Sequence, residues 1–116
     1  MNNIVELYKA AWEGHNIELL KLIFHENIIY NDRDINLYVG IDELINYWIK
    51  NSKKQKNINF NPIEVTSCDD KIIILWETSF FHTIKKKKKF LKGIIIMTML
   101  DNKIIHFVEY FERKYI

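Results

Sequence analysis

Cysteine pairs are missing from this sequence of 116 residues. It contains a single cysteine, Cys68, which excludes an internal disulfide framework and fits a reducing compartment. The Cys68 thiol could be reactive, but we expect it to pack as a small buried hydrophobic group instead. The length is sufficient for one sizeable core, so we expect a single domain over residues 1–116.

Long apolar runs and a strong net charge are also missing. No stretch approaches the roughly 18–20 apolar residues of a membrane span. The first residues, MNNIVELYKAAW, lack the basic start and apolar run of a signal peptide, so we expect a cytoplasmic protein. The formal net charge of +2 is too small to indicate a nucleic-acid or membrane partner.

Metal-binding motifs are absent as well. The sequence has no HExxH motif and no paired cysteines and histidines, so we expect no metal and no cofactor. Residues 32–43 (DRDINLYVGIDE) resemble a calcium-binding loop, but Leu37 stands where the sharp turn needs glycine. We interpret Glu43 as first-turn acidity on a helix that begins at Ile41.

The first half of the chain carries helical periodicity. Apolar side chains at helical spacing predict helices over 4–15 and 41–51. Gly14 is a plausible end for the first of these. Asn16 can cap a second helix that carries Ile17, Leu20, Leu22, Ile23 and Phe24. A short strand over 27–31 and a polar loop over 32–36 follow.

The second half predicts four antiparallel strands in a meander, over roughly 58–67, 71–84, 90–100 and 103–113. Asp69-Asp70 and Asp101-Asn102 suit tight hairpin turns. Pro62 cannot donate a ladder hydrogen bond, which places the first of these strands at an edge or a bulge. Three helices followed by four long strands predict an α+β fold whose twisted sheet curls around the helices as a half-open cone. Such a cone leaves a concave interior in which a small, mostly apolar molecule could bind.

The predicted strand over residues 90–100 is apolar on both faces, so we expect each face to pack against another part of the protein or against a second copy. Ile94, Ile96 and Leu100 alternate with Ile95, Met97 and Met99. We assign Met97, Met99, Val108 and Tyr110 to an outer face too apolar to remain exposed, and expect a homodimer through it.

Three stretches resemble the nuclear transport factor 2-like superfamily, and within it the SnoaL-like and ketosteroid-isomerase-like proteins. They are YKAAWEGHNIELLKLIFHENIIYND, YVGIDELINYW and GIIIMTMLDNKIIHFVEYF, which together span most of the chain. The resemblance implies a cone-like α+β fold. It implies much less about function, because this fold hosts isomerases, cyclases, dehydratases, epoxide hydrolases and non-catalytic modules.

Matching to the steroid isomerase argues against that activity. The resemblance places the oxyanion tyrosine on Tyr8, but the tyrosine that supports it on Trp48 and the second oxyanion donor near Ile96. The base aspartate falls on Asn31, and a shift of one residue would place Asp32 there instead. Only Tyr8 keeps the required chemistry.

Glu109 is the most informative candidate for acid-base chemistry. It shares a strand face with Phe107 and Phe111, and the resemblance implies that this face lies inside the cone. A carboxylate among aromatic rings has its pKa raised and can act as an acid or a base. The alternative is the opposite register, in which Glu109 is solvated or paired with a basic residue. We name Glu109, Tyr8, Asn31 and Asp32 as candidate catalytic residues.

Other aromatic and histidine side chains form the expected pocket wall. Tyr8 and Trp12 lie one helical turn apart and can be pocket or ordinary core. The full set expected on the wall is Trp12, Trp48, Trp76, Phe80, His82, Ile96, Phe107 and Phe111. His106 lies three residues from Glu109, so we expect it on the outer face. We interpret Lys85–Lys89 as a solvated hairpin tip.

Two functions therefore stay open. The first is binding of a small apolar molecule inside the cone, with catalysis of the isomerase, cyclase or dehydratase kind as an extension. The second is a non-catalytic homodimeric interaction module whose pocket is filled by its own aromatic side chains. Pocket polarity separates them, because an enzyme needs convergent polar groups inside.

Overall fold

The computed structural model describes residues 3–114 and confirms the α+β fold. Its elements, in chain order, are α1 (Asn3–Glu13), α2 (Ile17–Ile23), β1 (Phe24–Asp32), β2 (Asn36–Val39), α3 (Ile41–Ser52), β3 (Gln55–Cys68), β4 (Lys71–His82), β5 (Lys87–Leu100) and β6 (Lys103–Arg113). Within this range no helix is both long and apolar enough to cross a membrane.

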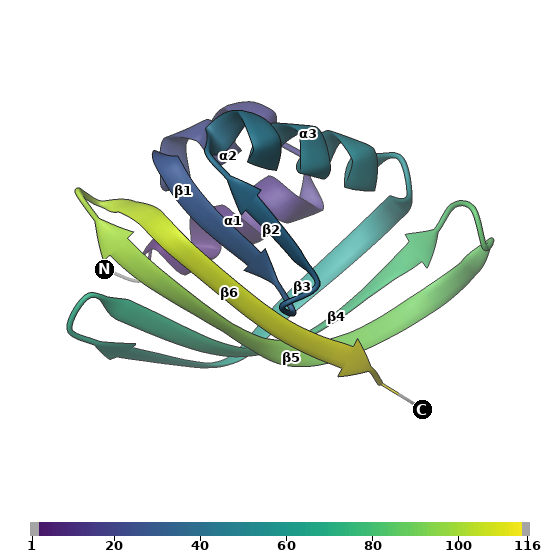
Figure 1. The fold of residues 1–116 in the computed structure, drawn as a ribbon. Helices are drawn as coiled ribbons and strands as arrows, with labels where there is room; N and C mark the ends of the chain where they lie inside the picture. Colours follow the sequence, from purple (N-terminus) through teal and green to yellow (C-terminus); the bar gives the residue numbers. More distant parts are fainter. Residues whose placement is uncertain (1–2, 115–116) are drawn as a thin grey trace.

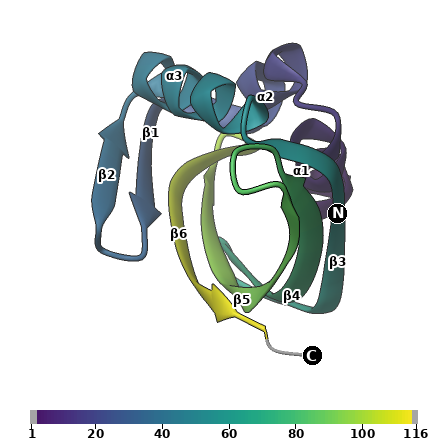
Figure 2. The ribbon, with the colours of Figure 1, turned by 90° about the vertical axis from the view of Figure 1, so that its right-hand side faces the viewer.

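The six strands form one curved sheet in the order β2-β1-β6-β5-β4-β3. The meander from β3 to β6 is antiparallel, whereas β1 pairs with β6 in parallel. Figures 1 and 2 show the sheet curling beneath the three helices, which all lie on its concave side. β2 and β3 are the two edges and do not pair with each other, so the cone stays open.

The helix boundaries follow local signals, with one correction. α1 ends before Gly14, and the Asn16 side chain accepts a hydrogen bond from the Leu19 N–H at 3.0 Å, as a helix cap does. Phe24, which the sequence placed in the second helix, instead begins β1. Leu22 is 66% exposed, so that helix buries a narrower stripe than predicted.

β2 is a strand that the sequence analysis did not predict. Its pairing with β1 sets Tyr38 opposite Tyr30 and Asn36 opposite Asp32. Arg33 and Asp34 both adopt positive φ in the turn between the two strands. Residues 32–36 were interpreted as a loop because they are polar, but they form the turn and the first pair of a β-hairpin.

The meander carries the turns and the irregularity that were predicted. Asp101 and Asn102 both have positive φ, and Asp69 does too, as tight hairpins require. β3 is an edge strand, and its register shifts between Pro62 and Glu64. Both expectations for Pro62, edge and bulge, are therefore confirmed.

The faces of β5 are the reverse of the prediction. Ile95 and Met97 are fully buried in the core, and Ile94 and Ile96 lie on the outer face. The ladder explains this, because Met97 pairs with Phe107, and directly paired residues share a face. The assignment of Met97 to a dimer surface was wrong.

Cys68 is the second correction. It lies at the end of β3 and is exposed, not buried as the sequence suggested. Its Sγ lies 3.9 Å from an Asp69 carboxylate oxygen. The hairpin position explains this, because a turn at the end of a long edge strand projects beyond the core.

Candidate functional site

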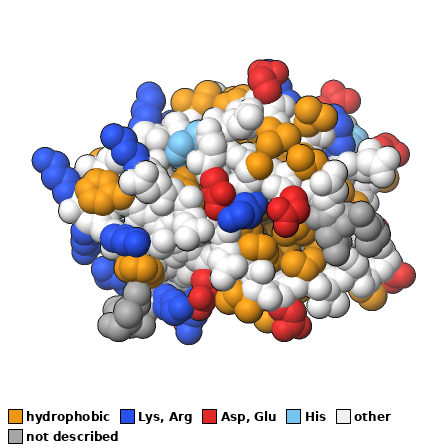
Figure 3. Space-filling model, turned by 180° about the vertical axis from the view of Figure 1, so that it is seen from behind, with side chains coloured by type: hydrophobic (Ala, Val, Ile, Leu, Met, Phe, Trp, Pro, Cys, Tyr) orange, Lys and Arg blue, Asp and Glu red, His pale blue; other side chains and the backbone are white. Residues whose placement is uncertain are grey.

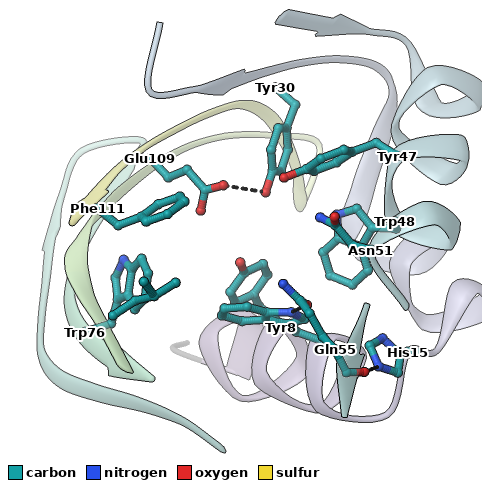
Figure 4. A pocket seen from close by; sticks show the side chains of 12 residues that line it. Tyr8, His15, Tyr30, Tyr47, Trp48, Asn51, Gln55, Trp76, Glu109 and Phe111 are labelled. Atoms are coloured by element: carbon teal, nitrogen blue, oxygen red, sulfur yellow. Dashed lines mark hydrogen bonds between the residues drawn. The ribbon is translucent and has the colours of Figure 1, made fainter. Parts of the chain in front are cut away.

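A cavity of about 60 Å³ lies inside the cone, between the sheet and the helices. Figure 4 shows side chains from both layers converging on it. Its walls come from α1, α3 and every strand except β2. The lining residues are Tyr8, Trp12, His15, Tyr30, Tyr47, Trp48, Asn51, Gln55, Trp76, Leu91, Glu109 and Phe111.

Glu109 provides the only carboxylate on this wall. It is 6% exposed, and its register opposite Ile95 turns it toward the helices. Its Oε1 accepts a hydrogen bond of 3.0 Å from the Tyr30 hydroxyl. In Figure 4 the second carboxyl oxygen faces the open centre of the cavity. The structure therefore places Glu109 inside, which excludes the alternative of a solvated side chain.

Burial raises the pKa of Glu109 to about 8, and the negative charge of Asp32 adds to this effect. The hydrogen bond from Tyr30 and the positive charge of Arg33 act in the opposite direction. Glu109 is therefore mostly protonated at neutral pH, and a modest change in its surroundings can move its proton.

Three tyrosine hydroxyls surround this carboxyl group. The Tyr30 hydroxyl donates to Glu109, and those of Tyr8 and Tyr47 lie on the same cavity wall. Burial raises the pKa values of Tyr8, Tyr30 and Tyr47, and the charge of Glu109 contributes to each. All three hydroxyls consequently stay protonated and serve as hydrogen-bond donors.

The rim of the cavity is half-buried and polar. The indole N–H of Trp12 donates to Gln55 Oε1 at 3.0 Å, and the His15 ring lies 2.9 Å from the Gln55 backbone oxygen. Asn51 and Tyr47 lie on the α3 side of the cavity. These contacts hold the two sides of the rim in place around an opening.

Six of the predicted site residues meet at this cavity. They are Tyr8, Trp12, Trp48, Trp76, Glu109 and Phe111. All three tryptophans of the chain are among them. Whether they bind a ligand or take part in catalysis remains a prediction.

Four residues expected on the wall lie elsewhere. Ile96 occupies the outer face, opposite Val108. Phe107 is fully buried behind Tyr30, with their rings stacked at 4.4 Å. Phe80 is buried further along the inner face of β4. His82 lies at the end of β4, where its Nδ1 accepts a hydrogen bond from the Lys85 N–H.

Asn31 and Asp32 are separated by the alternation of the strand. The Asn31 side chain makes two hydrogen bonds of 2.8 Å with Asp34, away from the cavity. Asp32 is buried on the inner face, where β1 pairs it with Glu109. The Arg33 Nε donates to it at 2.8 Å. Of the two candidates, Asp32 is therefore the one on the inner face, although it lies behind Glu109 and not on the cavity wall.

Several lining residues were missed, and some had a signal. Tyr30 alternates with Ile28 and Asp32, so a two-residue period places it inside. Tyr47 and Asn51 lie four residues apart, beside the buried face of α3 that was identified from Leu44 and Trp48. Gln55 lay in a segment interpreted as a polar linker and carried no signal.

No cluster of three or more potential metal-ligating side chains occurs among residues 3–114. The lysine run Lys85–Lys89 forms the exposed β4–β5 turn and the start of β5. Figure 3 shows basic side chains gathered at the end of the molecule that carries this hairpin. His106 is exposed on the outer face, as predicted.

Sequence and structural comparisons agree on the family. Residues 4–107 match the SnoaL-like domain. The chain belongs to this family. The family lies within the nuclear transport factor 2-like superfamily, as the resemblance implied. None of the curated proteins matches the sequence.

Solved structures show the same fold at low sequence identity. A protein with a ketosteroid isomerase-like fold from Catenulispora acidiphila, in complex with trimethylamine, has a TM-score of 0.83 at 16% identity, covering 92% of this chain and 83% of that chain. A candidate SnoaL-like polyketide cyclase from Shewanella denitrificans has a TM-score of 0.85 at 11% identity, covering 96% of this chain and 89% of that chain. An LEH-like epoxide hydrolase of M. tuberculosis has a TM-score of 0.83 at 8% identity, covering 95% of this chain and 80% of that chain.

Proposed function

We propose that this SnoaL-like protein binds a small molecule in the cavity and that Glu109 transfers a proton to or from it. The observation that carries the proposal is the Glu109 carboxyl group, buried, held by Tyr30 at 3.0 Å and with its other oxygen toward the cavity. Proton transfer of this kind is common to isomerase, cyclase and dehydratase reactions.

The neighbouring residues have supporting roles in this proposal. Tyr30 orients Glu109 through its hydrogen bond, and Tyr8 offers a further hydroxyl on the cavity wall. Asp32 acts through its charge on Glu109 and does not contact the ligand. Asn31, turned away toward Asp34, has no part in it.

The ligand that we propose is smaller than a steroid or a polyketide ring system. A cavity of about 60 Å³ has room for roughly four to six water-sized probes. The trimethylamine complex of the Catenulispora neighbour supports a ligand of that size in this fold. The competing hypothesis, a pocket filled by its own aromatic rings, accounts less well for a cavity with convergent polar groups.

A thermal-shift screen of molecules with up to about eight non-hydrogen atoms tests the proposal. A ligand that binds only the folded state raises the melting temperature. We expect the hit to be lost in Glu109→Gln and kept in Glu112→Gln, which removes an exposed carboxylate from the outer face of the same strand. Equal shifts in both variants would remove Glu109 from the site, and the absence of any hit would favour the self-filled pocket.

We further propose that the outer sheet face mediates a homodimer in the cytoplasm, the reducing compartment that the lone Cys68 supports. Ile63, Leu75 and Tyr110 on this face are 56%, 43% and 43% exposed, and they border one groove together with Ile94. We expect Ile94→Lys to sediment as a monomer. Leu22→Lys, at a 66% exposed position on a helix away from this face, should stay dimeric. A monomeric wild type would refute the interface.

A further inference from the structure

Aromatic rings dominate the cavity wall. Seven of its lining residues are aromatic: Tyr8, Trp12, Tyr30, Tyr47, Trp48, Trp76 and Phe111. They come from both layers of the fold, and Figure 4 shows them on several sides of one open centre. Faces of such rings carry negative partial charge and attract cations, with tryptophan the strongest.

The charge of the cavity wall also favours a cationic ligand. Glu109 is the only acidic residue lining the cavity, and no lysine or arginine lines it. The guanidinium of Arg33 donates to Asp32 at 2.8 Å and stacks 4.2 Å from the centre of the Phe111 ring, so its charge is already paired. An anionic ligand would therefore enter without a partner for its charge, which is costly in a buried site.

The hydrogen-bonding groups of the wall determine which kind of ammonium ion the cavity can hold. The Tyr30 hydroxyl already donates to Glu109, and Gln55 Oε1 already accepts from Trp12. A primary ammonium needs about three hydrogen-bond acceptors, whereas a quaternary ammonium needs none and gains contact with ring faces. The size of the cavity, about 60 Å³, suits a head group of this kind.

We infer that the ligand of this cavity is a small methylated or quaternary ammonium compound, held by the aromatic rings and by the Glu109 carboxylate. The inference rests on the proposed small-molecule function and adds the chemical class of the ligand to it. Glu109 forms the ion pair, and the rings replace the water that the cation loses on entry.

Binding of such a cation is linked to a proton. Glu109 is mostly protonated at pH 7 in the empty site, and a cation beside it favours the carboxylate, so binding releases a proton. The charged and titratable groups that face Glu109 are Asp32, Arg33, Tyr8, Tyr30 and Tyr47. The tyrosines stay neutral and Arg33 stays charged over pH 6–9. The other titratable side chain on the wall, His15, lies at the rim against the Gln55 backbone oxygen. Ionisation of Glu109 by itself should raise the affinity by up to about tenfold per pH unit below pH 8.

The test compares choline with 3,3-dimethylbutan-1-ol, which has the same shape with carbon in place of the charged nitrogen. Binding is followed by tryptophan fluorescence, because all three tryptophans line the cavity, and by calorimetry in two buffers of different ionisation enthalpy. We expect choline to bind at least about tenfold more tightly than the alcohol and to release a proton at pH 7. Glu109→Gln should lose the preference and the proton, and Glu112→Gln should keep both.

The outcomes separate this inference from the proposed function. Equal or tighter binding of the neutral alcohol would overturn the cationic ligand class while leaving a small-molecule site in place. Binding of neither compound at millimolar concentration would also overturn it, and the thermal-shift screen would then decide the wider proposal. An undiminished choline preference in Glu109→Gln would show that Glu109 is not the partner of the cation and would contradict the inference.

Discussion

The burial of Glu109 among aromatic rings lowers the stability of the folded state whenever its carboxyl group is ionised. Its pKa of about 8 lies above the ordinary value near 4.5, so the folded state holds the proton more tightly than the unfolded state. Stability is then fully present below the unfolded pKa and falls as pH rises toward 8. Asp32, paired with Glu109 across β1 and β6, strengthens this dependence.

Glu109→Gln should remove that pH dependence. We expect the variant to gain stability relative to wild type between pH 5 and pH 8, by up to about 1.4 kcal/mol per pH unit, with no further gain above it. Urea unfolding at pH 5, 6, 7, 8 and 9 measures the difference. A constant difference across this range would show that Glu109 titrates as a solvated group.

Tyr30→Phe tests the hydrogen bond to Glu109 separately. The bond, 3.0 Å long, should contribute about 1.5–3 kcal/mol when Glu109 is ionised and about half of that when it is neutral. The variant should therefore lose more stability at pH 9 than at pH 6, measured by urea unfolding against wild type. An equal loss at both values would mean that Tyr30 contributes only through packing.

Among single residues, the sequence predicted the buried carboxylate and several of the aromatic side chains of the cavity, but not the polar side chains at its rim. Glu109, Tyr8 and Trp12 were identified because face and helical spacing are local properties of the chain. Gln55 and His15 were not, since they join the site only when α1 and β3 come together. The inward face of Asp32 had a local signal in its alternation with Ile28 and Tyr30, whereas its pairing with Glu109 depends on the register of β1 against β6.

At the scale of the elements, the β5–β6 ladder positions the site. Glu109 pairs with Ile95, and Phe111 pairs with Gly93. Continued from the Leu100–Lys103 pair without interruption, a regular hairpin would set Ile96 opposite Phe107 and place both inside. The register shift between Thr98 and Met99 makes Met97 the partner of Phe107 instead, which turns Met97 inward and Ile96 outward and explains the error.

Gly93→Ala should destabilise this ladder. A Cβ at position 93 would collide with the Tyr110 backbone oxygen and come within 2.7 Å of the Phe111 Cβ. We expect a loss of about 1–3 kcal/mol in the free energy of unfolding, because β6 must shift and carries the cavity wall with it. Chemical denaturation of the variant measures the loss. A change below about 0.5 kcal/mol would mean that β5 and β6 separate easily at this point.

At the scale of the whole molecule, the helices and the meander were predictable, and the closure of the cone was not. Apolar periodicity and turn residues determine each hairpin locally. The parallel pairing of β1 with β6 joins residues about 80 positions apart, as in the bond between Tyr30 and Glu109, and has no local signature. That pairing adds β1 to the curved sheet, which together with the helices encloses the cavity.

The same long-range closure decides whether Glu109 is buried, so its titration reports on the whole arrangement. The most direct measurement is the pKa of Glu109 in the wild-type protein, from the pH dependence of its side-chain carboxyl carbon by NMR, assigned with Glu109→Gln. A pKa near 8 is the predicted result. A pKa near the ordinary value of 4.5 would mean a solvated carboxylate and would contradict the aromatic acid-base site on which the proposed function depends.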